Sequence, residues 1–365
     1  MGCFLKTLIR YKGMSNMCNI AGYVGSKQAA PVLLEMLKKQ EGFDSGFYTG
    51  IATIHEGKIY YAKVVGDTNT LIEQTNAASL PGTIGIAHSR TPGGVDEENK
   101  WAHPFTTEKN GDVLIAQVLN GWAGCWTPRE PEYLALAKQL IDEGYPMKSA
   151  IHAPGKHWSI DGSISVHTSD VFTQLTAKNM DQGADVVSAL RESYVRMPEE
   201  TVTLMLSVTE PNAIAWGRLN FPMFQATAQD GMYLATSPQA LPEEVNEHHM
   251  LPAASSGLVY KDHYTCYPFP NDLQKVIGPI TPEIRAKAYD IVSQALRESR
   301  QTIQSLRPFV KPLFAPTVCP QINALTYDIL WDLHQQGRLI IDKEYGPGVL
   351  AHLKAPTLYL RLKDK

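Results

Sequence analysis

Several features are absent from this sequence, and each absence excludes a class of protein. No run of 18 or more apolar residues occurs, so no membrane-spanning helix is predicted. Neither a GxxxxGK nor a GxGxxG run is present, so no glycine-rich phosphate-binding loop for a nucleotide is predicted. The five cysteines are odd in number and widely spaced, and they form no CxxC pair, which argues against a disulfide framework and a zinc knuckle. We therefore expect no metal, no cofactor and no membrane as a partner.

The bulk composition is that of an ordinary globular protein. Of 365 residues, 44% are hydrophobic and 19% are charged, with a formal net charge of −4. This length suits two domains or one large one, and the composition supports a sizeable core. Because there is no basic excess, nucleic acid is not expected as a partner. Sparse cysteine favours a reducing, cytoplasmic setting.

The first 17 residues precede any regular pattern. They carry basic residues but lack the apolar core of a secretory signal. We predict that residues 1–17 are a leader or propeptide that is absent from the mature protein. A start at Met17, downstream of the written one, is the alternative.

Short strands and helices alternate irregularly between residues 18 and 270. Residues 18–25 and 82–90 resemble buried strands, and two strand-like runs meet at Glu56-Gly57 as a hairpin. Apolar residues recur at helical spacing over 29–40, 68–77 and 130–144, and a further helix is predicted to be capped near Ser169 or Asp170. Hairpins mixed with helices favour an antiparallel α+β sandwich over a parallel sheet.

Residues 271–365 have a different character. Thr281-Pro282-Glu283 is a good helix start, because a capping residue is followed by proline at the first helical position. Prolines between residues 308 and 320 indicate a linker, and residues 321–337 are predicted to form a second helix. Strands around the Gly346-Pro347-Gly348 turn follow it. This region is therefore predicted to be a helical linker plus a small α/β extension, similar to a winged helix.

Cys18 acquires a chemical role if residues 1–17 are removed. Its α-amine, with a pKa near ~8, could then take the proton of its own thiol, with a pKa near ~8.5, without help from a histidine. A buried cysteine is otherwise most often a small apolar side chain. The context of Cys18 decides between these two interpretations.

Five sequence blocks in order resemble one family. MCNIAGYVG, beginning at Met17, is similar to the opening of class-II glutamine amidotransferases, and Glu41–Gly46 resembles a motif of the glucosamine-6-phosphate synthase version. The blocks GIAHSR (85–90) with WAHPF (101–105), LNG (119–121) and SDVFTQL (169–175) follow with the family's rough spacing. Related domains occur in glutamate synthase and amidophosphoribosyltransferase. The resemblance implies a four-layer αββα Ntn-hydrolase sandwich over residues 18–270.

The resemblance also implies roles for individual residues. Cys18 would attack the glutamine amide, and the Asn120 side chain with the Gly121 backbone N–H would hold the oxyanion. Arg90 would pair with the substrate α-carboxylate, and Asp170 with its α-ammonium, although Asp170 also suits a helix N-cap. The predicted site is thus catalytic at Cys18, Asn120 and Gly121, and substrate-binding at Arg90, Asp170 and His103.

Some residues depart from the family pattern. Asn19 follows the nucleophile where glycine is usual, and Thr91–Gly94 replaces the usual aromatic, small residue and threonine after the arginine. An insertion at about 153–163 precedes Asp170. The changes at Asn19 and Thr91–Gly94 leave open which amide is hydrolysed. For the insertion, a lid and a partner contact are both open interpretations.

The resemblance implies glutamine as substrate and ammonia as product. No recognisable acceptor domain follows, so we expect a separate, glutamate-synthase-like acceptor subunit. Two alternatives stay open at this point: an Ntn amidase acting on another amide, and a non-catalytic ligand-sensing protein.

Overall fold

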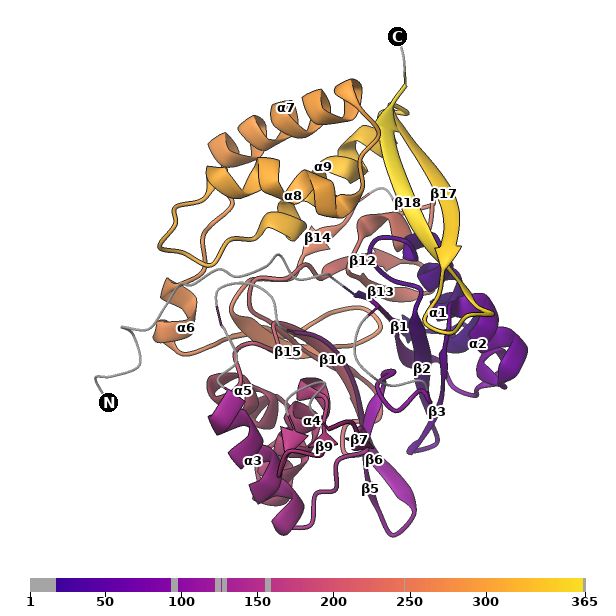
Figure 1. Cartoon of the computed structure of the whole chain (residues 1–365), viewed down its shortest axis with the longest axis vertical. Coiled ribbons are helices and arrows are strands. Elements are labelled where there is room, and N and C mark those ends of the chain that lie inside the picture. Colours follow the sequence, from indigo (N-terminus) through magenta and orange to yellow (C-terminus); the bar gives the residue numbers. More distant parts are fainter. Residues whose placement is uncertain are drawn as a thin grey trace.

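The computed structural model describes residues 18–92, 98–121, 126, 130–154, 159–245 and 247–363. Two antiparallel sheets lie face to face, with helices on their outer sides, as the ribbon view shows (Figure 1). This arrangement is the predicted four-layer αββα sandwich.

The first sheet carries the predicted nucleophile strand at its centre. Its strands run in the order β14-β12-β13-β1-β4-β2-β3, and β1 pairs antiparallel with both β13 and β4. The bounds are β1 (Asn19–Gly25), β2 (Tyr48–His55), β3 (Lys58–Val65), β4 (Ile84–Arg90), β12 (Phe224–Ala228), β13 (Gly231–Ala235) and β14 (His249–Met250). The predicted hairpin turn is confirmed, because Glu56 and Gly57 both adopt positive φ between β2 and β3.

The second sheet carries the predicted oxyanion residues. Its order is β16-β15-β11-β10-β6-β5, and β6 ends at Asn120 beside β10. The bounds are β5 (Phe105–Lys109), β6 (Asp112–Asn120), β10 (Val202–Ser207), β11 (Ile214–Arg218), β15 (Ser255–Val259) and β16 (Tyr267–Pro268). Apolar side chains from both sheets fill the space between them, including Ile20, Ile86, Val118, Leu204 and Leu234.

Helices close the two outer faces. Helices α1 (Ala29–Gln40) and α2 (Thr68–Gln74) cover the first sheet, and α3 (Glu130–Asp142), α4 (Thr168–Asp181) and α5 (Val186–Arg196) cover the second. The predicted 29–40 helix is confirmed with the same bounds, because Leu33, Leu34 and Leu37 present one buried face. Short elements complete this region: η1 (Ala77–Ser79), η2 (Pro238–Ala240) and a three-stranded sheet of β7 (Ile151–His152), β8 (Ser159–Ile160) and β9 (Ile164–Ser165).

Beyond the short helix α6 (Asn271–Lys275) lies a helix–hairpin module, residues 282–362. It comprises α7 (Pro282–Glu298), α8 (Ile303–Val310), η3 (Lys311–Leu313), α9 (Ile322–Gln335), β17 (Leu339–Pro347) and β18 (Lys354–Leu362). Between α7 and α8, Gln301 forms an antiparallel bridge to Leu360 of β18. The module thus consists of three helices, a bridge after the first and a terminal hairpin. Its predicted similarity to a winged helix stays a prediction.

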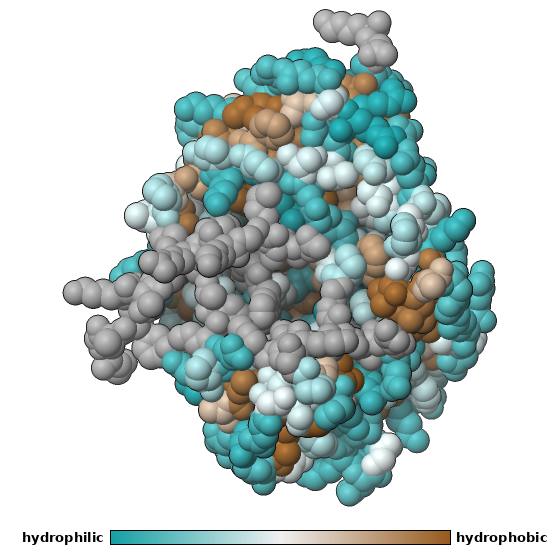
Figure 2. All heavy atoms as spheres, in the orientation of Figure 1, coloured by the Kyte–Doolittle hydropathy of each residue, from teal (hydrophilic) through white to brown (hydrophobic). Residues whose placement is uncertain are grey.

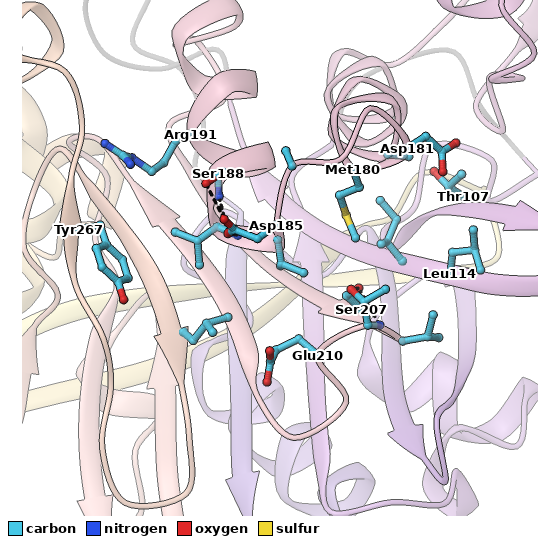
Figure 3. Close-up of a pocket in the computed structure, with 18 residues that line it drawn as sticks. Thr107, Leu114, Met180, Asp181, Asp185, Ser188, Arg191, Ser207, Glu210 and Tyr267 are labelled. Atoms are coloured by element: carbon cyan, nitrogen blue, oxygen red, sulfur yellow. Dashed lines mark hydrogen bonds between the residues drawn. The ribbon is translucent and has the colours of Figure 1, made fainter.

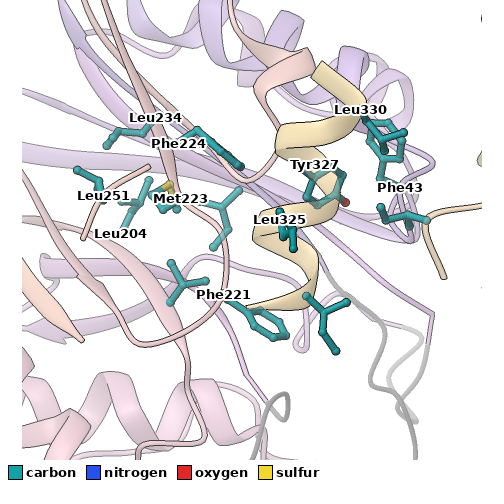
Figure 4. Close-up of a cluster of buried hydrophobic side chains, with 14 of the residues drawn as sticks. Phe43, Leu204, Phe221, Met223, Phe224, Leu234, Leu251, Leu325, Tyr327 and Leu330 are labelled. Carbon is teal, nitrogen blue, oxygen red and sulfur yellow. The ribbon is translucent and has the colours of Figure 1, made fainter. Parts of the chain in front are cut away.

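The third helix of this module packs its apolar side chains against the sandwich core. Leu325, Tyr327 and Leu330 of α9 pack with Phe221 and Phe224 in one buried apolar cluster (Figure 4). Because burial of such side chains contributes roughly 1.5–3 kcal/mol each, the module and the sandwich stabilise one another. The predicted division at residue 270 stays a prediction.

Three local expectations were wrong. Pro308, expected at the start of a linker, lies inside helix α8 (Ile303–Val310). Helix α4 is capped by His167, whose ring accepts a hydrogen bond from the Ser169 N–H, rather than by Ser169 or Asp170. Helix α2 ends at Gln74 rather than 77, because the backbone turns extended at Thr75; η1 begins at Ala77.

The face shown in the space-filling view is mostly hydrophilic, and its apolar side chains gather in small patches, one of them over α7 (Figure 2). Within the described ranges, no helix is long and apolar enough to cross a membrane. The leader 1–17 lies outside the described residues, as do Gly93, Gly94 and residues 155–158 of the insertion.

Candidate active site

Cys18 stands directly before the central strand β1 and is partly buried. Burial raises the pKa of its thiol, and the nearby Asp44 carboxylate adds to the rise. The Arg90 charge and hydrogen bonds from the Thr91 N–H and hydroxyl lower the pKa again. The thiol is therefore protonated at neutral pH in this form, so attack requires a base.

Arg90 ends strand β4, which runs beside β1 with Asn19 opposite Ser89. This register places Arg90 next to Cys18. The guanidinium lies 5.0 Å from the ring centre of Tyr48 and 5.7 Å from that of Trp101. Aromatic faces hold a guanidinium in place by cation–π contact. The predicted pairing with a substrate carboxylate stays a prediction.

Asn120 reaches Cys18 from the opposite sheet. Its Nδ2 donates a hydrogen bond to the Cys18 carbonyl oxygen at 2.8 Å. His88 on β4 fixes this orientation, because its Nε2 lies 3.3 Å from Asn120 Oδ1 and 3.1 Å from the Leu119 carbonyl oxygen. Both neighbours are acceptors, so Nε2 carries the proton. The amide N–H₂ of Asn120 is thereby held toward the nucleophile, as an oxyanion donor requires.

His88 is a neutral hydrogen-bond donor in this site. Burial, with a contribution from Arg90, lowers the pKa of its ring to about 3. Its ring centre lies 3.9 Å from that of His103, which is 1% exposed. Burial also lowers the pKa of His103 well below the ordinary value. The structure thus places His103 behind His88, in contact with the residue that orients Asn120; its predicted contact with substrate stays a prediction.

Asp170 lies in the first turn of α4 and is fully buried. Its Oδ2 accepts hydrogen bonds from the Ser149 N–H at 2.7 Å and from Ser149 Oγ at 2.8 Å. Its Oδ1 accepts one from Gln174 Nε2 at 2.9 Å. Most of the acceptor positions of this carboxylate are therefore used within the protein.

Glu200, just before β10, was not predicted from the sequence. Its side chain has no exposed surface, and an ideal Cβ added to Gly121 would lie 2.5 Å from Glu200 Oε2. Glycine at 121 thus lets a carboxylate lie against the predicted oxyanion loop. Burial raises the pKa of Glu200 to about 7. Two adjacent acids, Glu199-Glu200, are usually solvated, so no sequence signal marked this one.

The helix–hairpin module also touches the site. Asp44, in the loop 41–46, forms an ion pair of 2.7 Å with Arg307 of α8, and both side chains are less than a tenth exposed, at 8% and 4%. The Phe43 ring packs edge-on against Tyr327 of α9 at 5.3 Å, and the Leu358 N–H donates to the Gly42 carbonyl oxygen at 3.0 Å. These contacts were missed because the partners are more than 250 residues apart along the chain.

A separate pocket of about 690 Å³ lies between α4, α5 and the second sheet (Figure 3). None of the predicted site residues lines it. Across the described part of the chain, no group of three or more metal-binding side chains occurs. His248 faces Asp328 at 3.4 Å.

The architecture and the paired site elements define the fold of Ntn-type amidotransferases. A solved structure of glutamine phosphoribosylpyrophosphate amidotransferase from B. subtilis, complexed with ADP and GMP, matches with a TM-score of 0.53 and 14% identity over 76% of this chain and 58% of that chain. A structure of an allosteric regulatory enzyme of purine biosynthesis matches with a TM-score of 0.55 and 13% identity, covering 90% and 67% of the two chains. At these identities the likeness shows the fold.

The sequence relatives specify the resemblance further. Glutamine–fructose-6-phosphate aminotransferase (isomerizing) of Pyrococcus horikoshii is 28% identical over 253 residues, covering 68% of this chain and 37% of the relative. Its counterpart in Caldanaerobacter subterraneus subsp. tengcongensis is 29% identical over 250 residues, covering 67% and 36%. No family model matches the chain. The predicted resemblance to class-II glutamine amidotransferases is confirmed, and the chain spans little more than a third of these relatives' length.

Proposed function

We propose that this chain hydrolyses the side-chain amide of glutamine through a thioester on Cys18 and releases glutamate and ammonia. The observation that carries the proposal is the orientation of Asn120, whose amide N–H₂ is held toward Cys18 by the Nε2–H of His88. Such a donor has a clear use if an oxyanion forms beside the thiol. The similarity to glutamine-using relatives supports glutamine as the substrate.

The chemistry starts from an N-terminal Cys18. The sulfur attacks the amide carbon while the α-amine takes the thiol proton, and the oxyanion is held by the Asn120 side chain and the Gly121 N–H. When the tetrahedral intermediate collapses, the C–N bond breaks and the α-ammonium returns its proton to the departing ammonia. Water then attacks the thioester while the α-amine accepts its proton. The C–S bond breaks, the α-ammonium returns the proton to the Cys18 sulfur, and glutamate leaves.

The decisive test combines two measurements on the mature protein. Intact mass reports whether residues 1–17 are removed, and glutamate release is compared between wild type and Cys18→Ala. Cys266→Ala is the matched control, because Cys266 is an exposed free cysteine that takes no part in the described site. We expect Cys18→Ala to be inactive and the control to be unchanged. A retained leader without glutamate release contradicts the proposal and favours the ligand-sensing alternative.

A second candidate is an Ntn amidase acting on a different amide. It is favoured by Thr91, the first residue of the altered Thr91–Gly94 segment, which hydrogen-bonds the Cys18 thiol. A panel of amides separates the two candidates, because a glutaminase should prefer glutamine to amides that lack its α-groups.

We further propose that the ammonia passes to a separate acceptor subunit, of glutamate-synthase type, in a cytoplasmic setting. The support is that the chain matches 36–37% of the length of relatives whose names join nitrogen transfer to an isomerisation. Affinity capture from native extract, followed by glutamine-dependent amination assays with the captured protein, tests this. Repeated capture without a partner counts against it.

A further inference from the structure

The Glu200 carboxylate is buried, and no cationic partner lies beside it among the described residues. Ser169 Oγ donates to its Oε2 at 2.9 Å and the Thr168 hydroxyl faces it, whereas the nearest other charge acting on it is the acid Glu199. Its Oε1 has no well-aligned hydrogen-bond partner within the described ranges. A buried carboxylate of this kind is costly unless a cation completes it. Among the described residues, none supplies a cation to this carboxylate.

The position of Glu200 matches one end of the proposed substrate. Its carboxyl atoms lie against Gly121, whose N–H would bind the oxyanion, since an ideal Cβ there would come within 2.5–2.7 Å of them. The amide carbon and the α-nitrogen of extended glutamine are about 5 Å apart, from standard bond lengths. An amide held at Gly121 therefore has its α-ammonium within reach of this carboxylate.

Asp170 is the competing candidate, by family resemblance. Three hydrogen bonds from Ser149 and Gln174 already occupy its oxygens, so its carboxylate is compensated without substrate. Glu200 instead accepts a hydrogen bond from the hydroxyl of Ser169, in the first turn of the same helix, and its Oε1 has no well-aligned partner in the described ranges. Of the two carboxylates, Glu200 is therefore the one with fewer hydrogen bonds from described residues to offset its charge.

We infer that Glu200, rather than Asp170, receives the α-ammonium group of glutamine. This inference rests on the proposed glutaminase function and names the residue that gives it selectivity for an α-amino acid. Glu200 binds the substrate but takes no part in bond breaking. Substitution of Glu200 should therefore change mainly KM.

The test uses two substrates that differ only in the ammonium group. L-Glutamine and glutaramate, which carries hydrogen in place of the α-ammonium, are compared by ammonia release in the wild type, Glu200→Gln and Asp170→Asn. The wild type should prefer glutamine by about 10- to 100-fold in kcat/KM, the range expected for a charge-assisted hydrogen bond. Glu200→Gln should abolish this preference through a higher KM for glutamine while turnover of glutaramate persists. Asp170→Asn should keep the preference, even if its stability falls.

Each other outcome overturns the inference in an identifiable way. A preference that survives Glu200→Gln shows that Glu200 does not bind the ammonium, and one that is lost in Asp170→Asn assigns it to Asp170. A wild type without preference hydrolyses amides but does not recognise the ammonium. A wild type that hydrolyses neither substrate refutes the proposed function itself.

If Glu200→Gln fails to fold, the pH dependence of KM in the wild type provides a second test. The groups facing Glu200 are Glu199, Tyr133 and Tyr194, and burial raises the pKa of both tyrosines well above the ordinary value. As the pH falls from 8 to 6, protonation of Glu200 should raise KM for glutamine and leave KM for glutaramate unchanged. Equal changes for both substrates contradict the inference.

Discussion

Removing Arg307 tests how firmly the helix–hairpin module holds the loop beside the nucleophile. Arg307 and Asp44 form an ion pair of 2.7 Å, with side chains 4% and 8% exposed. Breaking a buried pair by removing one partner costs about 3–5 kcal/mol, because the other charge stays buried. Arg307→Met should lower the free energy of unfolding by about that amount. The Cys18 thiol pKa should also rise, because Asp44 already raises it and loses its neutralising partner.

The assay is urea unfolding of wild type, Arg307→Met, Asp44→Asn and the double variant, together with the pH dependence of Cys18 alkylation. Arg361→Met is the matched control, since the Arg361–Asp342 pair in the same module is 43% and 42% exposed and should contribute less than about 1 kcal/mol. The double variant should recover much of the loss, because neither charge remains.

Two results would refute this reasoning. One is a decrease in the free energy of unfolding for Arg307→Met that is no greater than the decrease for Arg361→Met. The other is a double variant whose loss equals the sum of the single losses, because the two residues would then act independently. An unchanged thiol pKa would separately show that the module does not influence the nucleophile.

Three further predictions concern single residues. Asn120→Asp should lower kcat for glutamine by about 10²–10³-fold with little change in KM, measured by steady-state ammonia release, because the variant loses an oxyanion donor; an unchanged kcat would remove Asn120 from the oxyanion site. His88→Leu should lower kcat by about tenfold by freeing the Asn120 amide, without moving the pH profile, since the ring pKa of about 3 keeps it neutral; loss of an acid limb would contradict this. Burial raises the Glu41 pKa from 4.5 to about 7, so the native state binds the extra proton and its stability falls as the pH rises between these values. Glu41→Gln should therefore be more stable than wild type at pH 8, by up to about 3 kcal/mol in urea unfolding, and similar at pH 4.5; a less stable variant at pH 8 would contradict the sign.

The parts of the site that could be predicted from the sequence lie at the ends of buried strands. Cys18, Arg90 and Asn120 each border a short apolar run, and the pairing of β1 with β4 and the facing position of β6 bring them together. The family resemblance marks these residues, and the apolar runs beside them predict the strands that they border. The same holds for helix α1, whose apolar face predicts its bounds.

The remaining features depend on contacts that no local pattern encodes. Glu200 is buried because Gly121 leaves space beside it, and this space is visible only when β6 and β10 are paired. The start of α4 depends on a histidine ring acting as a cap acceptor, which capping statistics do not favour. Helix α8 tolerates Pro308 because tertiary packing of Ile303, Leu306 and Val310 outweighs the lost hydrogen bond.

Because helix α9 and its neighbours contact the loop 41–46, they also determine when this loop can acquire its tertiary contacts during synthesis. The loop 41–46 is made early, but its partners Arg307, Tyr327 and Leu358 leave the ribosome last. A nascent chain stopped before residue 303 would carry the nucleophile and the oxyanion residues, yet Asp44 would lack its counter-charge and Phe43 its apolar cover. Ribosome-bound chains of increasing length should therefore gain protease resistance at this loop only after about residue 360, once strand β18 has emerged.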